Sequence, residues 1–209
     1  MKHDYTKAPL ERGPRGPFTR HSGPVDTLVV HYLWTRLDDP TDMARVAEWH
    51  RARSFNGPGY HYLIRADGSV EYGRPEWARG AHVLNQNNRK IGIAFEGGRL
   101  PGSKDGHDTR TPDQKAKMRK LIRDIKKRHP SIKRVVGHRD LDVTQCPGFD
   151  VAAWWAKAKA KPAPRGVPAV DRDAAAVRRD GKPWFRHDDC QHSWGGFMAI
   201  LAGLMRGGK

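Results

Sequence analysis

The run LVVHYLW at residues 28–34 constrains the fold most strongly, because it is apolar on both faces of an extended chain. Successive side chains of a β-strand point to opposite faces, so Val29, His31 and Leu33 would share one face. A strand with two apolar faces must be covered on both sides, which is typical of an interior strand. We therefore expect a strand over these residues near the centre of a sheet, with His31 buried in it.

Further strand patterns occur along the sequence. Residues 59–74 (GYHYLIRADGSVEYGR) predict a β-hairpin around the two-residue turn Asp67-Gly68. Residues 90–96 (KIGIAFE) predict a second buried strand, which ends at a pair of glycines. Residues 133–137 predict another strand.

Two helices are expected between these strands. The first spans residues 41–53, with Thr41 as its N-cap. The second begins at residues 111–114 (TPDQ), which offer an N-cap, a proline at the first helical position and a capping box, and it stops before Pro130. Strands interleaved with helices predict an α/β (α+β) fold with a central mixed β-sheet flanked by helices.

Composition divides the 209 residues into four parts. Residues 1–24 are basic and rich in Gly and Pro, so we expect an N-terminal arm that lies over the surface. Residues 25–156 form the expected folded body, and residues 157–183 form an Ala/Lys/Pro-rich linker. Residues 184–209 regain aromatic side chains and a short apolar run.

The last segment leaves two interpretations open. Residues 194–205 (WGGFMAILAGLM) are too few to cross a bilayer, which takes roughly 20 apolar residues. They could contact an anionic membrane at its interface, or they could fold back onto the body. His187, Cys190 and His192 offer a second metal site, but three ligands in so short a stretch are only a weak indication.

The charge balance indicates the kind of partner. The chain has 39 Lys and Arg against 23 Asp and Glu, a formal net charge of +16. Such a surplus implies an acidic partner, either nucleic acid, anionic lipid or an anionic wall polymer. The basic residues are scattered and form no recognised nucleic-acid motif, so we expect no specific nucleic acid. The N-terminal residues have no apolar core of a secretory signal, which predicts synthesis in the cytoplasm.

Three candidate metal ligands are spread over the chain. His31 lies in the first buried strand, and His138 and Cys146 begin and end the segment HRDLDVTQC. Zinc held by three protein groups keeps a position open for water, as in a catalytic site. The alternative is a satisfied core His31, a surface His138 and a structural Cys146. A disulfide between Cys146 and Cys190 would remove the proposed thiolate.

A series of short motifs carries a family resemblance. From about residue 27 to residue 155 the chain contains, in order, VVHY, EWH, GYHYLI with DGSVEYGR, GAHVLNQN followed by IGI, and GHRDL with QCPGFD. In these motifs it resembles the zinc N-acetylmuramoyl-L-alanine amidases, the superfamily of phage lysozyme-amidases and peptidoglycan recognition proteins. The resemblance implies a Zn²⁺ enzyme that acts on peptidoglycan, with the three candidate ligands holding the metal.

The resemblance also implies two catalytic hydroxyls. Tyr60, in GYHYLI, matches the active-site tyrosine of the family, and its alternative is a half-buried strand residue on the face of Tyr62 and Ile64. Thr144 stands where the phage enzymes resemble one another in carrying a lysine and the active recognition proteins carry a threonine. Its hydroxyl would donate to the developing oxyanion without adding positive charge.

Three more polar residues are candidates for binding the muramyl-peptide. His82 and Asn87 match groove residues of the family, and each could instead be a polar residue that caps a loop. His61 could contact substrate, support the metal ligands, or face solvent.

The chain departs from a related branch at one position. Cytoplasmic muropeptide amidases carry a glutamate as a proposed general base where this chain has Ala94. Glu96 lies two residues further on, and it would serve as the base only if it pointed toward the metal.

The expected function is hydrolysis of the amide between N-acetylmuramic acid and L-alanine of the stem peptide. We expect a monomeric phage-type endolysin that reaches the wall in the host periplasm after the inner membrane is breached. The competing hypothesis is a peptidoglycan-binding protein without activity. Members of that kind typically lack the cysteine ligand, so Cys146 favours the enzyme.

Overall fold

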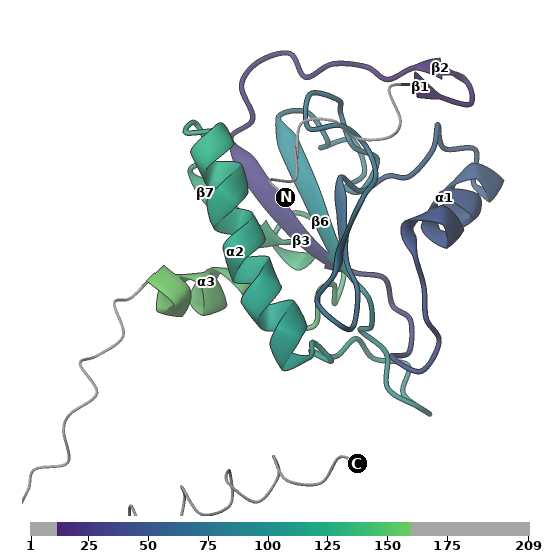
Figure 1. Cartoon of the computed structure of the whole chain (residues 1–209), viewed down its shortest axis with the longest axis vertical. Helices are drawn as coiled ribbons and strands as arrows, with labels where there is room; N and C mark the ends of the chain where they lie inside the picture. Colours follow the sequence, from purple (N-terminus) through teal and green to yellow (C-terminus); the bar gives the residue numbers. More distant parts are fainter. Residues whose placement is uncertain (1–11, 160–209) are drawn as a thin grey trace, which may run out of the picture. The chain divides into compact units, whose positions relative to one another are not determined.

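The strand around His31 lies inside a five-stranded sheet (Figure 1). A computed structural model describes residues 12–159 of the chain. In it, β3 (Thr27–Tyr32) pairs in parallel with β6 (Lys90–Phe95) on one side and with β7 (Arg134–Gly137) on the other. This confirms the predicted interior position of the strand.

The other side of β6 carries the predicted hairpin. Strand β4 (Tyr62–Ile64) pairs in parallel with β6, and β5 (Val70–Tyr72) pairs antiparallel with β4 at the edge of the sheet. The strand order is β5-β4-β6-β3-β7. The sheet is therefore mixed, as the alternation of strands and helices predicted.

The strands β3 and β6 end at the same edge of the sheet. β3 stops at Tyr32, two residues before the expected end, and Trp34 adopts the left-handed region with φ 58°. β6 is followed by Gly97 and Gly98, with φ 116° and 102°. A Cβ on Gly98 would lie 2.5 Å from the Tyr32 ring, so this close approach requires glycine. Beyond these ends the two segments stay paired, since Thr35 N donates to Gly97 O and Arg99 N donates to Thr35 O.

Helix α2 (Pro112–Arg128) covers one face of the sheet (Figure 1). The predicted capping box forms, since Gln114 N donates to Thr111 Oγ1 and Thr111 N donates to the Gln114 side chain. Its apolar stripe packs in the main core beneath Leu28, Val30, Tyr62, Ile64, Ile91, Ile93 and Phe95. Helix α3 (Val151–Lys159) adds Val151 and Trp155 to this core and extends three residues past the expected boundary at residue 156.

Helix α1 (Met43–Ala52) packs against the opposite face of the sheet. Met43 and Val46 contact Leu63 of β4 and Ala94 of β6. The predicted N-cap is wrong, because Asp42 and not Thr41 accepts the Arg45 N–H at 2.8 Å.

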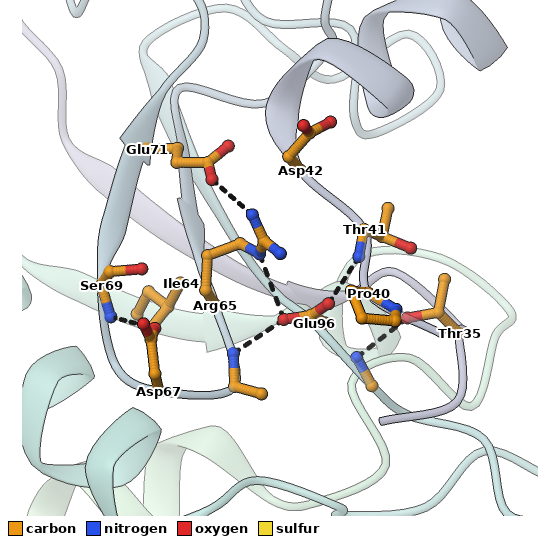
Figure 2. Close-up of polar contacts among 12 residues, drawn as sticks. Thr35, Pro40, Thr41, Asp42, Ile64, Arg65, Asp67, Ser69, Glu71 and Glu96 are labelled. Carbon is orange, nitrogen blue, oxygen red and sulfur yellow. Dashed lines mark hydrogen bonds and ion pairs between the residues drawn. The ribbon is translucent and has the colours of Figure 1, made fainter. Parts of the chain in front are cut away.

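A buried carboxylate holds Thr41 instead (Figure 2). Glu96 Oε1 accepts the Thr41 N–H at 2.6 Å, while Oε2 accepts the Ala66 N–H at 2.8 Å and the Arg65 Nε–H at 3.2 Å. Glu71 accepts from Arg65 and from the Met43 N–H, both at 2.6 Å. Glu96 thus ties the end of β6 to the start of α1 and to the β4–β5 hairpin.

The described part of the N-terminal arm packs on the body. Residues 12–24 include the two short strands β1 (Arg12–Gly13) and β2 (Gly16–Pro17). Phe18 is 5% exposed, and the Arg74 guanidinium lies 4.7 Å from its ring centre. Within residues 12–159 no helix is long and apolar enough to span a membrane. The predictions for residues 160–209 lie outside the described residues.

Candidate metal centre and cleft

Three distant segments bring the candidate ligands together at the carboxyl ends of β3 and β7. His31 comes from β3, His138 opens the short helix η1 (His138–Asp140) after β7, and Cys146 lies in the next loop. One ligand atom from each residue lies within 4.8 Å of the other two. His31 Nδ1 is 3.8 Å from Cys146 Sγ, and the rings of His31 and His138 are 4.6 Å apart.

The donor set and its protonation suit a divalent metal. Ligands on tetrahedral zinc, at about 2.0 Å for nitrogen and about 2.3 Å for sulfur, lie roughly 3.5 Å apart, close to the observed separation of His31 from Cys146. Burial, together with the nearby His138, holds the pKa of His31 well below 6.5. Burial also lowers the pKa of His138. Both imidazoles are therefore neutral near pH 7, which is the form that binds metals.

Cys146 needs a cation beside it to ionise. The residue is 5% exposed, and burial raises the pKa of its thiol to about 12, although the Tyr32 N–H at 3.4 Å opposes the shift. A bound divalent cation reverses this penalty, because a coordinating thiol is deprotonated outright. The buried thiol thus fits a metal ligand better than a free nucleophile.

A cleft opens over the candidate ligands. Its walls carry two partly exposed tryptophans, Trp34 and Trp49, which are 45% and 37% exposed, and the cationic Arg53. Among its lining residues are the three candidate ligands and both predicted catalytic hydroxyls: His31, Tyr32, Leu33, Trp34, Val46, Trp49, His50, Arg53, Tyr60, His138, Thr144 and Cys146. The predicted catalytic residues and ligands therefore face one space.

Tyr60 enters the cleft on the α1 side of the sheet. It packs with the cluster that contains Leu63, so it does not share the face of Tyr62 and Ile64, and that expectation is wrong. The reason is that β4 begins only at Tyr62, so strand alternation does not extend back to Tyr60. Burial first, and then the Cys146 side chain, raise the pKa of the Tyr60 phenol, which stays a proton donor.

Thr144 is half-buried at the other side of the cleft. Its Oγ1 accepts the Cys146 N–H at 3.2 Å. A hydroxyl that accepts one hydrogen bond still has its own proton to donate. The contact fixes the oxygen beside the cysteine and leaves the O–H for another acceptor.

His50 also lines the cleft, although in the sequence it stands out only as part of the EWH motif within an expected helix. Its Nδ1 accepts the Gly59 N–H at 2.7 Å, and its ring lies 5.4 Å from that of Tyr60. Burial, with Arg53 and Arg74, lowers the pKa of His50 to about 4, so the ring is neutral. The one signal in the sequence is the EWH motif. His50 also falls on the buried stripe of α1 with Met43, Val46 and Ala47, so helical periodicity by itself does not indicate a place in the cleft.

The three candidate substrate-binding residues are not among the residues that line this cleft. His82 is 8% exposed, and its Nδ1 is 3.0 Å from His31 Nε2. Asn87 Oδ1 accepts the His82 N–H at 2.8 Å, as a polar residue that caps a loop would. His61 is fully buried, so the solvent-facing interpretation is wrong.

Glu96 lies away from this cleft. Its two carboxylate oxygens are occupied by Thr41, Ala66 and Arg65, and it is 1% exposed. The condition for a general base, a carboxylate that points toward the metal ligands, is therefore not met.

Comparisons with known proteins agree with this geometry. A sequence model of the N-acetylmuramoyl-L-alanine amidase family matches residues 21–149. The endolysin of Klebsiella phage KP32 is 30% identical over 130 residues, which are 62% of this chain and 85% of that protein. A peptidoglycan-recognition protein of Drosophila melanogaster is 32% identical over 149 residues, covering 68% of this chain and 77% of that protein.

A solved structure shares the fold. The endolysin and N-acetylmuramoyl-L-alanine amidase LysCS from Clostridium intestinale URNW superposes with a TM-score of 0.57 at 29% identity. The match covers 69% of this chain and 90% of that one. The family model matches more than half of the chain, the fold is shared, and the His, His and Cys side chains converge. The chain therefore belongs to the N-acetylmuramoyl-L-alanine amidase family of peptidoglycan hydrolases.

Proposed function

We propose that the chain is a zinc amidase that cleaves the bond between the lactyl group of N-acetylmuramic acid and L-alanine of the stem peptide. His31, His138 and Cys146 would hold the metal. The observation that carries the proposal is the convergence of these three side chains, within 4.8 Å of one another, on a cleft that also contains Tyr60 and Thr144.

The residues of the cleft have separate roles in this proposal. Zinc, when bound, would act as a Lewis acid that activates water and polarises the amide carbonyl. The described lining residues of the cleft include no carboxylate that could activate water instead. The phenol of Tyr60 stays protonated and donates a hydrogen bond to the oxygen that becomes negative. Thr144 donates its O–H to the same oxygen and brings no charge.

The walls of the cleft would bind the rest of the substrate. Trp34 and Trp49 offer flat apolar surface for a sugar ring, and Arg53 offers a cation for a carboxylate of the stem peptide. His82, Asn87 and His61 are not among the lining residues, so we assign them no substrate contact.

We further propose that the chain works as a phage endolysin. Support comes from its similarity to the phage KP32 endolysin over most of that protein's length. The enzyme would be made in the infected cell and act on the wall after the inner membrane opens. A net charge of +16 suits an anionic wall.

The cysteine ligand gives the test of this proposal. Cys146→Ser should lose its zinc and reduce lysis of chloroform-treated bacteria by at least about 100-fold, because one of three ligands is removed. The matched control is Val143→Ala in the same loop, whose side chain is fully exposed and should not matter. Metal analysis of wild-type protein should find one zinc per chain. Near-normal lysis by zinc-free Cys146→Ser protein would overturn the proposal.

A further inference from the structure

We propose that His82 is a positioning residue of the metal centre, which keeps His31 in the tautomer that leaves its Nδ1, the nitrogen that faces Cys146, without a proton. Asn87, His61 and two glycines hold His82 in turn. The inference rests on the proposed function, because it assigns a role at the proposed zinc site. It replaces the substrate contacts that the family resemblance implied for these side chains.

The contact between the two imidazoles selects the tautomer. His31 Nε2 and His82 Nδ1 face each other at 3.0 Å, and the ring planes are tilted by 77°. Of two facing ring nitrogens, one must carry the proton and the other must accept it. A ligand that binds metal through Nδ1 carries its proton on Nε2, so His31 is the donor and His82 the acceptor. His31 Nδ1, 3.8 Å from Cys146 Sγ, is then free for the metal.

The backbone of His82 is fixed by Asn87. Asn87 Oδ1 accepts the N–H groups of His82 at 2.8 Å and Val83 at 2.9 Å, and Asn87 Nδ2 donates to Val83 O at 2.5 Å. All the polar atoms of this side chain are therefore used within one loop. Asn87 thus fixes the backbone position from which the His82 side chain projects.

Two glycines make room for the ring of His82. A Cβ on Gly92 would lie 2.6 to 2.8 Å from three atoms of the ring, and a Cβ on Gly80 would lie 2.3 Å from one of them. Gly92 is in the interior of β6, where glycine weakens a strand and often marks a close approach of another group. The glycine of the IGI motif is explained by this slot.

His61 fixes the backbone of Gly92. Its backbone N–H donates to Gly92 O at 2.9 Å, and its Nδ1 accepts the Gly92 N–H at 2.9 Å. Its Nε2 therefore carries the ring proton and donates to Ala78 O at 2.9 Å. The contacts run from His61 to Gly92, from Gly92 to His82, and from His82 to His31.

Zinc affinity of the purified full chain, measured by competition with a chromophoric chelator, tests the role of His82. His82→Phe keeps a ring but removes the acceptor, so zinc binding should weaken by about 10- to 100-fold. His82→Asn puts an amide oxygen where Nδ1 was and should bind within about three-fold of wild type. Gly92→Ala should weaken binding like His82→Phe, although Gly92 contacts no proposed ligand.

Controls and a second readout separate positioning from misfolding. Leu84→Ala removes an exposed side chain two residues from His82 in the same loop, and it should leave zinc affinity unchanged. In the metal-free protein, long-range ¹H–¹⁵N spectra should show His31 protonated on Nε2 in wild type and in His82→Asn. His82→Phe should instead show a mixture of tautomers.

The outcomes distinguish this inference from the proposed function. Equal zinc affinity of wild type and folded His82→Phe, or the same His31 tautomer in both, would overturn the positioning role. If wild type bound no zinc while the tautomers differed as expected, the proposed function would fail and the hydrogen-bond assignment would stand.

Discussion

At the scale of single residues, Tyr60 is placed in the cleft by a histidine. His50 accepts the N–H of Gly59, the residue before Tyr60, and its ring lies beside the tyrosine ring. A Cβ on Gly59 would lie 2.1 Å from Ala81 O, so the chain has no room for a larger residue here. The position of the phenol thus depends on a neutral imidazole in α1 and on a crowded turn.

His50→Leu should lower kcat about 10-fold with little change in KM or zinc content, because small misplacements of a catalytic group are costly. His50→Asn, which keeps an acceptor near the Nδ1 position, should stay within about three-fold of wild type. The measurement is steady-state hydrolysis of purified peptidoglycan. If His50→Leu cost as much in a Tyr60→Phe background as in wild type, the two residues would not be coupled and the account would be wrong.

The three candidate ligands can be picked out by residue type and motif order, but the residues that contact them cannot. A histidine in an apolar strand and a later His and Cys are visible in the sequence. The orientation of the His82 ring is not visible in the sequence, because it depends on the space left by Gly80 and Gly92, which lie in two separate segments of the chain. For the same reason, the sequence left His61 open between three roles.

At the scale of elements, the helices and strands follow their sequence patterns, and their ends follow tertiary contacts. The capping box of α2 is local, so the sequence predicted it correctly. The N-cap of α1 was missed because the Thr41 N–H is bound by Glu96, which is 55 residues away in the chain. Strand β3 ends early because Trp34 turns into the left-handed region, which an apolar run does not predict.

Glu96→Gln should destabilise the fold and leave catalysis intact. One oxygen that accepts a backbone N–H would be replaced by an amide NH₂, which cannot accept it, and the negative charge beside Arg65 would be lost. Together these changes should lower the free energy of unfolding by about 3 kcal/mol. The kcat of the folded protein should stay within about two-fold of wild type, as measured at a temperature where both are folded.

Urea unfolding and steady-state kinetics check this expectation. The control is Glu48→Gln on the exposed side of α1, which should change neither quantity. A large fall in kcat without loss of stability would mean that Glu96 acts as the general base after all.

At the scale of the whole described body, stability and chemistry use opposite faces of the sheet. The main core lies under α2 and α3, whereas His31, Tyr60 and α1 lie on the other face. The cleft can therefore carry strained turns and polar side chains without opening the main core.

Two truncations should show where the folded body ends. A chain of residues 1–161 keeps α3. Its Tm and its rate of hydrolysis of purified peptidoglycan should equal those of the full chain. A chain of residues 1–149 loses the buried Val151 and Trp155, each worth about 1.5–3 kcal/mol, so its Tm should fall by roughly 10 °C or more. Thermal unfolding measured by circular dichroism checks both, and equal Tm values for the two truncations would contradict the role of α3.

The proposed enzyme is defined by the bond that it cleaves, and mass spectrometry of the soluble products from purified peptidoglycan identifies that bond. We expect free stem peptides that begin with an L-alanine amino terminus, and glycan strands without new reducing ends. Products that keep the stem peptide attached to N-acetylmuramic acid would contradict it.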